Sequence, residues 1–415
     1  MASGIHSTIR SLETRLQVRW TPKWHEAFRD PRGGFYERLG KGFKPVFTGQ
    51  RRLVAQCRQL SIYAHASNNN KVFKADLKKQ FEFILDRYYD NATGLWHYAL
   101  DDDGNVADKT CDLYALAFVI FACSHYYRAT GDERAEETAG NVLRLIDARF
   151  AMPVGLAEAL GPDSKPLPRV RRQNPHMHLL EACLFAQETW GGRNFEAMAD
   201  EMVSLFQSVF FDSKRGTLTE FFTDDLLPHP DMGDNLEPGH YFEWVWLLKK
   251  HGAMKGAPDL HDPFCLQLLV WANEHGWDEK YGGIYDIVSS SGYVVSDTKR
   301  IWPFCEALKA NALMLEAAPN RQDIKDRVTK MVGVFESKYM QERGFWTESL
   351  NRDLSAAADF MPATTPYHVY FGIAETWDVM QKRGAGKSLG SVVQIAMYRA
   401  RRSLSNAVKQ LRTGF

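Results

Sequence analysis

Helix-length stretches of two kinds alternate along the chain. Residues 113–123 are apolar on nearly every side, whereas the stretch that begins at Arg134 carries charges on one face. A helix that is apolar all round is buried, and a helix with one apolar stripe covers a surface. The pattern therefore predicts pairs of helices, one inner and one outer. The twelve predicted helices span residues 11–28, 51–66, 72–89, 112–128, 132–148, 175–189, 194–210, 240–251, 262–275, 302–317, 322–339 and 367–382.

A recurring glycine separates these pairs. At each position the glycine follows an outer helix and precedes a short hydrophobic or aromatic stretch, as in Gly94-Leu95-Trp96. Glycine suits a helix end that turns through positive φ, and a constant period of this length indicates a repeat architecture. The glycines are Gly34, Gly94, Gly155, Gly216, Gly283 and Gly344, with gaps of 60, 61, 61, 67 and 61 residues.

Six inner helices ringed by six outer helices predict an all-α fold, an (α/α)6 barrel of six helical hairpins with short β-like turns. An open solenoid needs polar caps at its ends. This chain instead begins with an outer-type helix and ends its sixth repeat with an inner-type one, which is consistent with closure. We expect residues 1–385 to form the barrel as one catalytic domain. Residues 386–415 would add an amphipathic helical extension, solvated or packed on the barrel, with a subunit contact as the less favoured role.

Composition narrows the class of protein. The chain has 415 residues, of which 45% are hydrophobic, and a net charge of +0, which gives no reason to expect nucleic acid or a membrane surface. The longest apolar run, residues 113–123, is too short to cross a bilayer, and the first residues lack a signal-peptide pattern. Six scattered cysteines without a CxxC pair are typical of reduced core thiols. We therefore expect a cytoplasmic protein.

One polar or aromatic side chain recurs near the start of each predicted inner helix. If the inner helices ring a cavity, these ends converge on one side of the barrel. A buried set of this kind is costly unless it binds something, although each member alone has a structural explanation, such as a satisfied core histidine. The six residues are Arg58, Tyr114, His178, His240, Trp302 and His368, with gaps of 56, 64, 62, 62 and 66 residues.

Two kinds of chemistry fit parts of this set. A metal site would use His176, His178 and His240, but His176 and His178 are two residues apart on a predicted helix and point to different sides. A glycoside hydrolase needs two carboxylates across the scissile bond. Three glutamates are available for that role: Glu181, Glu243 and Glu306.

A third chemistry, proton transfer on an open-chain sugar, fits the set best. It needs bases that titrate near neutrality, which is the natural range of histidine. It also needs donors for the oxygen of a developing enediolate. His178, His240 and His368, together with Arg58, meet both needs.

These residues lie in motifs that resemble the N-acylglucosamine 2-epimerase superfamily, which includes mannose isomerases, sulfoquinovose isomerases, cellobiose 2-epimerases and mannose 2-epimerases. The family fold is an (α/α)6 barrel, in agreement with the repeat. The matching segments cover nearly the whole chain, and the motifs around His178 and His240 are the most specific. They are Asp30-Pro31-Arg32-Gly33-Gly34-Phe35-Tyr36-Glu37, Gln56-Cys57-Arg58, Leu113-Tyr114-Ala115-Leu116-Ala117-Phe118, Asn174-Pro175-His176-Met177-His178-Leu179-Leu180-Glu181-Ala182, Pro238-Gly239-His240-Tyr241-Phe242-Glu243-Trp244, Trp302-Pro303-Phe304-Cys305-Glu306-Ala307 and Tyr367-His368.

The resemblance implies a role for each residue of the site. His240 and His368 would be the acid/base pair, and Glu243 would orient or charge His240. His178, near Asn174 on its own helix, would help to open the pyranose ring. No metal and no redox cofactor is implied. The implied substrate-binding residues are Arg58, which would stabilise the enediolate, and Tyr114, Asn174, Trp302 and Glu306.

Within the family, the Asp30–Glu37 motif and the single-domain length are most similar to the bacterial mannose isomerase branch. We therefore expect isomerisation of free mannose to fructose through a cis-enediol(ate), with His368 as the base. The alternative is 2-epimerisation of mannose, glucose, an N-acyl amino sugar or cellobiose, with two histidines acting on opposite faces. A glycoside hydrolase, or a non-catalytic sugar- or protein-binding relative, is the alternative from another class.

The expected partner is a small monosaccharide, bound by a monomer or a homodimer. A phosphate site favours a cationic cluster, whereas the predicted pocket mixes carboxylates with arginines. We therefore expect an unphosphorylated sugar. Arg169, Arg171 and Arg172 offer one place where a phosphate would bind.

Overall fold

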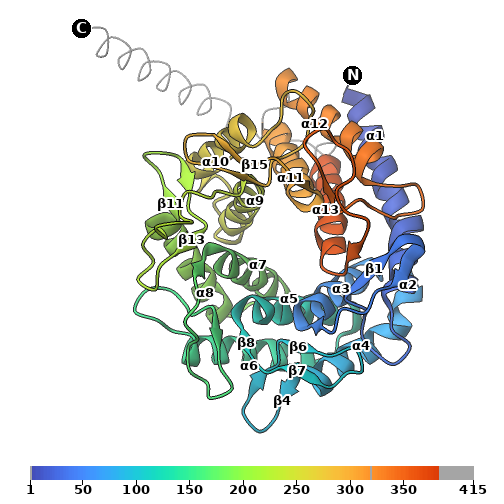
Figure 1. Ribbon diagram of the computed structural model, residues 1–415, viewed down its shortest axis with the longest axis vertical. Coiled ribbons are helices and arrows are strands. Elements are labelled where there is room, and N and C mark those ends of the chain that lie inside the picture. The colour runs from blue at the N-terminus through green and yellow to red at the C-terminus, as the bar shows by residue number, and fades with distance from the viewer. Residues whose placement is uncertain (1, 318–319, 383–415) are drawn as a thin grey trace.

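Six helices line the inside of a closed ring in the computed structural model, which describes residues 2–317 and 320–382 (Figure 1). Each packs against the next, and the last packs against the first, so the ring closes. Their N-terminal ends point to the same end of the ring, where the short strands lie. The inner helices are α3 (Leu53–Ala66), α5 (Leu113–Thr130), α7 (Gln173–Trp190), α9 (Pro238–Met254), α11 (Ile301–Ala317) and α13 (Thr365–Lys382).

A second layer of helices surrounds this ring. α1 and α2 are joined by the π-helical turn Leu16–Trp20 and act as one outer helix, and π-helical turns also follow α8 and α12. The two layers confirm the predicted (α/α)6 barrel, while the predicted extension at 386–415 lies outside the described residues. The outer helices are α1 (Ala2–Arg15), α2 (Thr21–Phe28), α4 (Lys74–Tyr88), α6 (Arg134–Arg149), α8 (Arg193–Leu205), α10 (Asp262–His275) and α12 (Gln322–Val334).

Burial follows the two predicted kinds of helix. In α5, Leu113 and every residue of 115–126 are buried, whereas α6 buries one stripe that includes Ala139, Val142 and Ile146. Asp112 caps the first turn of α5 by accepting a hydrogen bond from the backbone of Ala115 (2.9 Å). The repeating glycines take the conformation that the sequence predicts: all six have positive φ, from 64° at Gly155 to 90° at Gly283.

Short antiparallel strands connect each repeat to the next at one end of the ring. A bridge between Leu236 and Val288 connects the fourth repeat to the fifth. The other connecting pairs are β3 (Arg51–Arg52) with β6 (Ala99–Leu100), β8 (Cys111–Asp112) with β9 (Ala159–Leu160), β10 (Arg171–Arg172) with β13 (Phe221–Phe222), β16 (Lys299–Arg300) with β17 (Ser349–Leu350), and β18 (Met361–Pro362) with β1 (Arg38–Gly40). The pairing of β18 with β1 closes the ring a second time.

The remaining strands form local hairpins within a repeat. They brace the loops that precede the inner helices and therefore help to place the first residues of those helices. β2 (Lys44–Pro45) pairs with β1, β7 (Val106–Asp108) with β6, β4 (Tyr89–Asp90) with β5 (Leu95–Trp96), β11 (Phe211–Asp212) with β12 (Thr217–Leu218), and β14 (Ile287–Val288) with β15 (Val294–Ser296).

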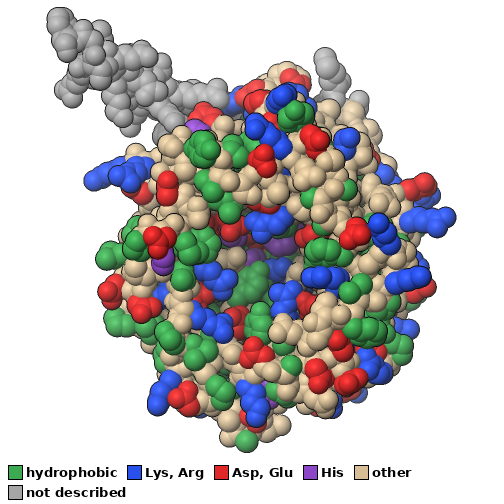
Figure 2. Space-filling view, in the orientation of Figure 1, with side chains coloured by type: hydrophobic (Ala, Val, Ile, Leu, Met, Phe, Trp, Pro, Cys, Tyr) green, Lys and Arg blue, Asp and Glu red, His purple; other side chains and the backbone are tan. Residues whose placement is uncertain are grey.

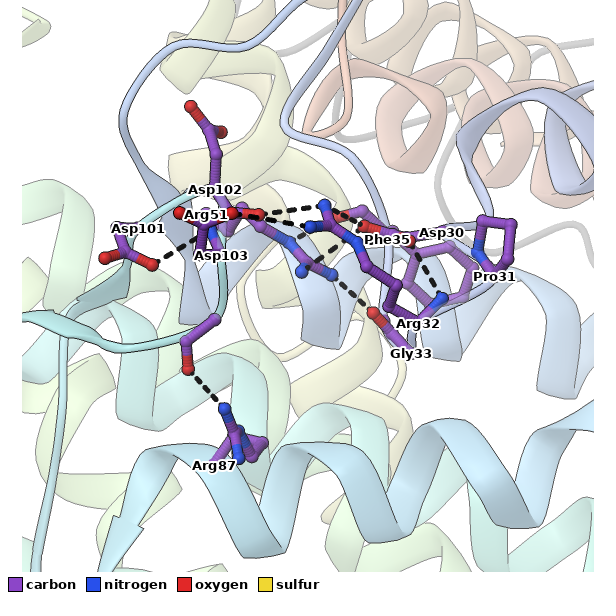
Figure 3. Close-up of polar contacts among 12 residues, drawn as sticks. Asp30, Pro31, Arg32, Gly33, Phe35, Arg51, Arg87, Asp101, Asp102 and Asp103 are labelled. Atoms are coloured by element: carbon purple, nitrogen blue, oxygen red, sulfur yellow. Dashed lines mark hydrogen bonds and ion pairs between the residues drawn. The ribbon is translucent and has the colours of Figure 1, made fainter.

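Arg51 fixes the first glycine turn, residues 33–35, through its polar contacts (Figure 3). This buried side chain donates hydrogen bonds to the carbonyl oxygens of Gly33 (2.5 Å) and Phe35 (3.2 Å), and it lies 3.5 Å from the carboxylate of Asp30. Arg32 covers the same carboxylate from outside. The Asp30–Glu37 motif therefore shapes a turn, and the family resemblance that it carries is structural.

The cysteines match the expectation from their spacing. All six are buried and carry free thiols. In the part of the chain that the structure describes, no helix has the length and apolarity needed to cross a membrane.

Candidate active site

The six residues that the spacing singles out gather where the inner helices begin. Figure 2 shows that the ring is hollowed at its centre, and that histidine, acidic and basic side chains are visible in the hollow. Arg58 donates a hydrogen bond to the hydroxyl of Tyr114 (2.5 Å), which joins the first two repeats. The ring contacts, by centroid distance, are Tyr114–His178 (5.0 Å), His240–Trp302 (5.0 Å) and Trp302–His368 (5.3 Å).

His240, in the first turn of α9, is held by a carboxylate. Its Nδ1 donates to Glu220 Oε2 at 2.8 Å, and both side chains are buried. Burial by itself lowers the pKa of His240, but the charge and hydrogen bond of Glu220, with weaker help from Glu237 and Glu243, raise this pKa to about 9. His240 is therefore an imidazolium at neutral pH.

Asn174, in the first turn of α7, reaches across to the same ring. Its Nδ2 lies 3.2 Å from His240 Nε2, and its Oδ1 is buried without a hydrogen-bond partner. The nitrogen of His240 accepts from the amide only when the ring is neutral. A half-turn of the amide presents Oδ1 to the protonated ring, so Asn174 can hydrogen-bond to His240 in either protonation state.

His368, in the first turn of α13, is neutral at neutral pH, in contrast to His240. Its Nδ1 lies 2.9 Å from Glu306 Oε1. Burial lowers the pKa of His368 to about 3, and the hydrogen bond to Glu306 opposes this only in part. Glu306 is buried as well, yet Lys309 and His368 lower its pKa to about 2. An ionised Glu306 can only accept, so Nδ1 of His368 carries the hydrogen and Nε2 keeps a free lone pair.

A group of glutamates lies deeper in the ring, next to His178. The Nδ1 of His178 donates to Glu181 Oε2 at 2.9 Å, and the hydroxyl of Tyr367 donates to the other oxygen of Glu181. Burial lowers the pKa of His178 well below its usual range. Burial and the charges of Glu306 and Glu181 raise the pKa of Glu243, and neither oxygen of Glu243 has a hydrogen-bond partner. The raised pKa favours the protonated form of Glu243, which donates a hydrogen bond.

Arg58, from α3, lies inside an aromatic box. Its guanidinium carbon is 4.2 Å from the ring centroid of Phe118, 4.6 Å from that of Tyr367 and 5.3 Å from that of Tyr114. The side chain is 4% exposed, and its Nε has no hydrogen-bond partner. The rings keep the cation in one orientation while some of its donors remain free.

Two contacts differ from the sequence-based expectation. The carboxylate that orients His240 is Glu220, not Glu243, whose Oε1 instead lies 3.7 Å from His178 Nε2. Asn174 contacts His240 rather than His178, because its side chain reaches from α7 to the neighbouring helix α9. The remaining predicted residues lie in the same group.

Glu220 is the functional side chain that sequence reasoning missed. It lies four residues after Gly216, just before β13, and it also accepts a hydrogen bond from Gln173 (2.8 Å). In three other repeats the acidic residue comes three residues after the glycine and pairs with the arginine that precedes an inner helix. Those pairs are Glu37–Arg52, Glu158–Arg172 and Asp286–Arg300. The recurring acid is the signal that would have found Glu220, and the one-residue offset hides it.

The metal set that the sequence disfavours does not form, because His176 lies outside the central group. Its Nδ1 donates to the carbonyl of Arg172 (3.0 Å), and its Nε2 accepts from the backbone of Leu156 (3.1 Å). Two other groups among the described residues have donor atoms within 4.8 Å of one another, as metal ligands do. One group is His178, Glu181 and Glu243, and the other is Glu243, Glu306 and His368.

The charge around those carboxylates favours proton transfer over metal binding. The ammonium of Lys309 lies 2.8 Å from Glu306 Oε2 and repels a cation there. Glu306 also accepts from His368, so both of its oxygens are already engaged. The arrangement combines an imidazolium, a neutral imidazole and a fixed guanidinium, which together can move a proton and stabilise an oxyanion.

The closed ring with this centre belongs to a known class of fold. A solved D-mannose isomerase superposes with a TM-score of 0.81 at 20% sequence identity, over 90% of this chain and 97% of that one. At this identity the match shows the fold alone.

Sequence comparison shows the family. The model of the N-acylglucosamine 2-epimerase (GlcNAc 2-epimerase) family matches residues 34–372, so the chain belongs to that family and is a sugar isomerase or epimerase. A protein of Rhizobium meliloti (strain 1021) named mannose-6-phosphate isomerase is 29% identical, over 92% of this chain and 100% of that protein. A cellobiose 2-epimerase of Bacteroides fragilis is 24% identical, over 69% and 77% of the two chains. Membership favours the isomerase expectation over the glycoside hydrolase and the non-catalytic alternatives.

Proposed function

We propose that this enzyme interconverts free mannose and fructose by moving a proton between C2 and C1 through a cis-enediol(ate). The observation that carries the proposal is the contrast between two histidines that flank Trp302. His240 is held protonated by Glu220, whereas His368 is kept neutral by burial. An aldose–ketose isomerisation needs one group that takes a proton from carbon and another that protonates oxygen. The two histidines form such a pair, because their surroundings raise the pKa of His240 and lower the pKa of His368.

Ring opening comes first, and His178 suits it. Its Nδ1 hydrogen is donated to Glu181, so Nε2 is free to take the proton of the anomeric hydroxyl. Glu243 lies 3.7 Å from that nitrogen, and its raised pKa favours the protonated form, which can donate a proton to the ring oxygen of the sugar. The open-chain aldehyde of mannose results.

His368 then acts as the base. Its Nε2 removes the proton from C2, while Glu306 holds the ring through Nδ1. The same nitrogen returns the proton to C1 on the same face of the enediol(ate), and fructose forms. One base on one face is sufficient, so this mechanism does not need a second histidine to reach a carbon atom.

His240 and Arg58 stabilise the oxygen atoms during that transfer. As the C2 proton leaves, negative charge develops on the carbonyl oxygen of C1. The imidazolium of His240 donates a proton to that oxygen and, once neutral, takes the proton of the C2 hydroxyl as the C2 carbonyl of fructose forms. A fixed guanidinium donates hydrogen bonds to the neighbouring oxygen. A single donor of this kind contributes roughly 10²–10³ to kcat in other enzymes.

The charge pattern at the mouth supports a free sugar. The three arginines that precede inner helices are each paired with an acidic residue, which leaves little net positive charge for a phosphate. Of the other candidates, Arg171 donates to backbone oxygens of Val154, Leu156 and Asp224, and Arg169 lies 3.8 Å from Asp112. The name of the Rhizobium meliloti relative makes mannose 6-phosphate the necessary comparison substrate.

Epimerisation at C2 is the second candidate, favoured by the cellobiose 2-epimerases among the relatives. In that reaction His240 would protonate C2 on the face opposite His368, and mannose would give glucose. The same residues serve both reactions, so the product decides between them.

The experiment is a product analysis with a panel of sugars. The purified protein is incubated with mannose, mannose 6-phosphate, glucose and cellobiose, and the products are identified by NMR. We expect fructose from mannose, with a higher kcat/KM than for the phosphorylated sugar. Turnover of mannose 6-phosphate or cellobiose without turnover of mannose would contradict the proposal.

A further inference from the structure

A buried lysine lies directly below the proposed base. Lys309 is one helical turn after Glu306 on α11 and is 3% exposed. Its ammonium lies 2.8 Å from Glu306 Oε2 and 3.2 Å from Glu375 Oε2 on α13, and 5.0 Å from the ring centroid of Trp246 on α9. A lysine side chain is rarely buried unless its charge is paired with an opposite charge.

We infer that Lys309 is a positioning residue, whose charge keeps Glu306 ionised so that His368 holds its hydrogen on Nδ1 and leaves Nε2 free as a base. This inference rests on the proposed function for its catalytic consequence. The hydrogen-bonding consequence can be observed without any turnover.

Carboxyl groups face Lys309 from every inner helix of this side of the ring. Glu306 comes from α11, Glu375 from α13, Glu243 from α9 and Glu181 from α7, and all four raise the pKa of Lys309. A second ammonium, that of Lys250 on α9, also contacts the ring of Trp246, at 5.3 Å from the ring centroid. Lys309 therefore offsets negative charge on buried carboxylates, where screening by solvent is weak.

Loss of this charge leaves the carboxylates uncompensated, and they take up a proton. When Glu306 is protonated, the hydrogen bond between Glu306 and His368 reverses its direction, because the carboxylic acid then donates to Nδ1. The ring hydrogen of His368 then lies on Nε2, so this nitrogen no longer has a free lone pair with which to take a proton from the substrate. Arg58 and His178 also face His368 and oppose its protonation, so the ring stays neutral and changes only its tautomer.

The direct test is the tautomer of His368 in the full chain, read by long-range ¹H–¹⁵N NMR after histidine labelling. His368→Asn assigns the signal. We expect the Nδ1–H form in the wild type and in Lys309→Arg, and the Nε2–H form in Lys309→Met. The same Nδ1–H form in all three proteins would overturn the inference, whether or not any sugar is turned over.

The kinetic test uses Lys250→Met as a matched control, because Lys250 shares the Trp246 ring but has no contact with Glu306. In Lys309→Met we expect kcat at neutral pH to fall roughly 10²-fold with KM little changed, and the acid limb of the kcat profile to move to higher pH. Lys250→Met should leave the limb in place. An equal loss of kcat at every pH in Lys309→Met would indicate a merely structural role. If this variant does not fold, Lys309→Met with Glu375→Gln also removes the carboxyl group that lies next to Lys309 and makes the same comparison.

Discussion

His240 donates its Nδ1 hydrogen to Glu220 Oε2 at 2.8 Å, and this one contact reverses the effect of burial on the histidine. Without Glu220 the ring would be neutral, as His178 and His368 are. The site would then hold three neutral imidazoles and no imidazolium. Glu220 thus decides which histidine gives a proton and which one takes it.

Glu220→Gln should therefore change the pH profile in a defined direction. The pKa of His240 is raised to about 9, so its protonated form is lost as pH rises through that value and the wild-type kcat falls there. Without the carboxylate the pKa falls to the ordinary value of about 6.5 or below. The alkaline limb of kcat moves down accordingly. The measurement is kcat against pH from 5 to 10.

Glu237→Gln is the control for that shift. Glu237 also raises the pKa of His240, but it acts only through its charge, and its effect on this pKa is smaller than that of Glu220. Its removal should move the alkaline limb in the same direction by less. Equal shifts in the two variants would mean that the hydrogen bond of Glu220 is unimportant.

His368→Asn should remove the base and leave the pocket intact. We expect kcat to fall by roughly 10²–10⁴, the usual contribution of a positioned base. Sugar binding, measured by calorimetry, should be largely kept. If the variant keeps more than about a tenth of the wild-type kcat, another group removes the C2 proton and His368 has been assigned the wrong role.

Arg58→Lys tests whether the guanidinium shape matters. Lysine keeps the charge but cannot stack on Phe118 and Tyr367 while donating in a plane. We expect kcat/KM for mannose to fall by roughly 10²-fold, with an unchanged circular dichroism spectrum. Arg128→Lys, at another aromatic ring in the barrel, should keep wild-type kinetics. Retained activity in both variants would mean that charge alone is sufficient.

Arg51 and Arg32 offer a matched pair for stability, since both contact Asp30. Arg51 is buried, and Arg51→Met removes a donor from two carbonyl oxygens and leaves Asp30 with Arg32 alone, at a cost of roughly 3–5 kcal/mol in unfolding free energy. The Arg32 side chain is 53% exposed, so Arg32→Met should cost about 0–1 kcal/mol. Urea denaturation of both variants measures the difference. Similar losses would show that the glycine turn does not depend on the buried contact.

The repeat made most of the fold predictable from the sequence. Apolar helices alternate with striped ones, and the glycines at Gly34 and its five equivalents mark every hairpin, so the closed ring follows from spacing. Local patterns carry this information because each hairpin must bury the same kind of face. The strand pairs that join the repeats, such as β18 with β1, could not be read from two-residue segments.

The site was predictable only in part, for a different reason. Spacing found the residues that start inner helices, including His240 and His368, because these share one place in the repeat. Glu220 comes from a loop, and Lys309 lies deeper in an apolar helix, where a single charge resembles a surface residue. The partner of each histidine depends on contacts between neighbouring helices, and helical periodicity within one segment does not encode them.

A proton NMR time course with mannose in D₂O follows the transfer of one proton between C2 and C1 by one base. We expect fructose to appear with deuterium partly incorporated at C1, and we expect His368→Asn to slow both product formation and exchange to the same extent. Glucose deuterated at C2 would contradict the isomerase proposal and establish a 2-epimerase. Mannose that stays unchanged while another sugar reacts would show that the substrate has been misassigned.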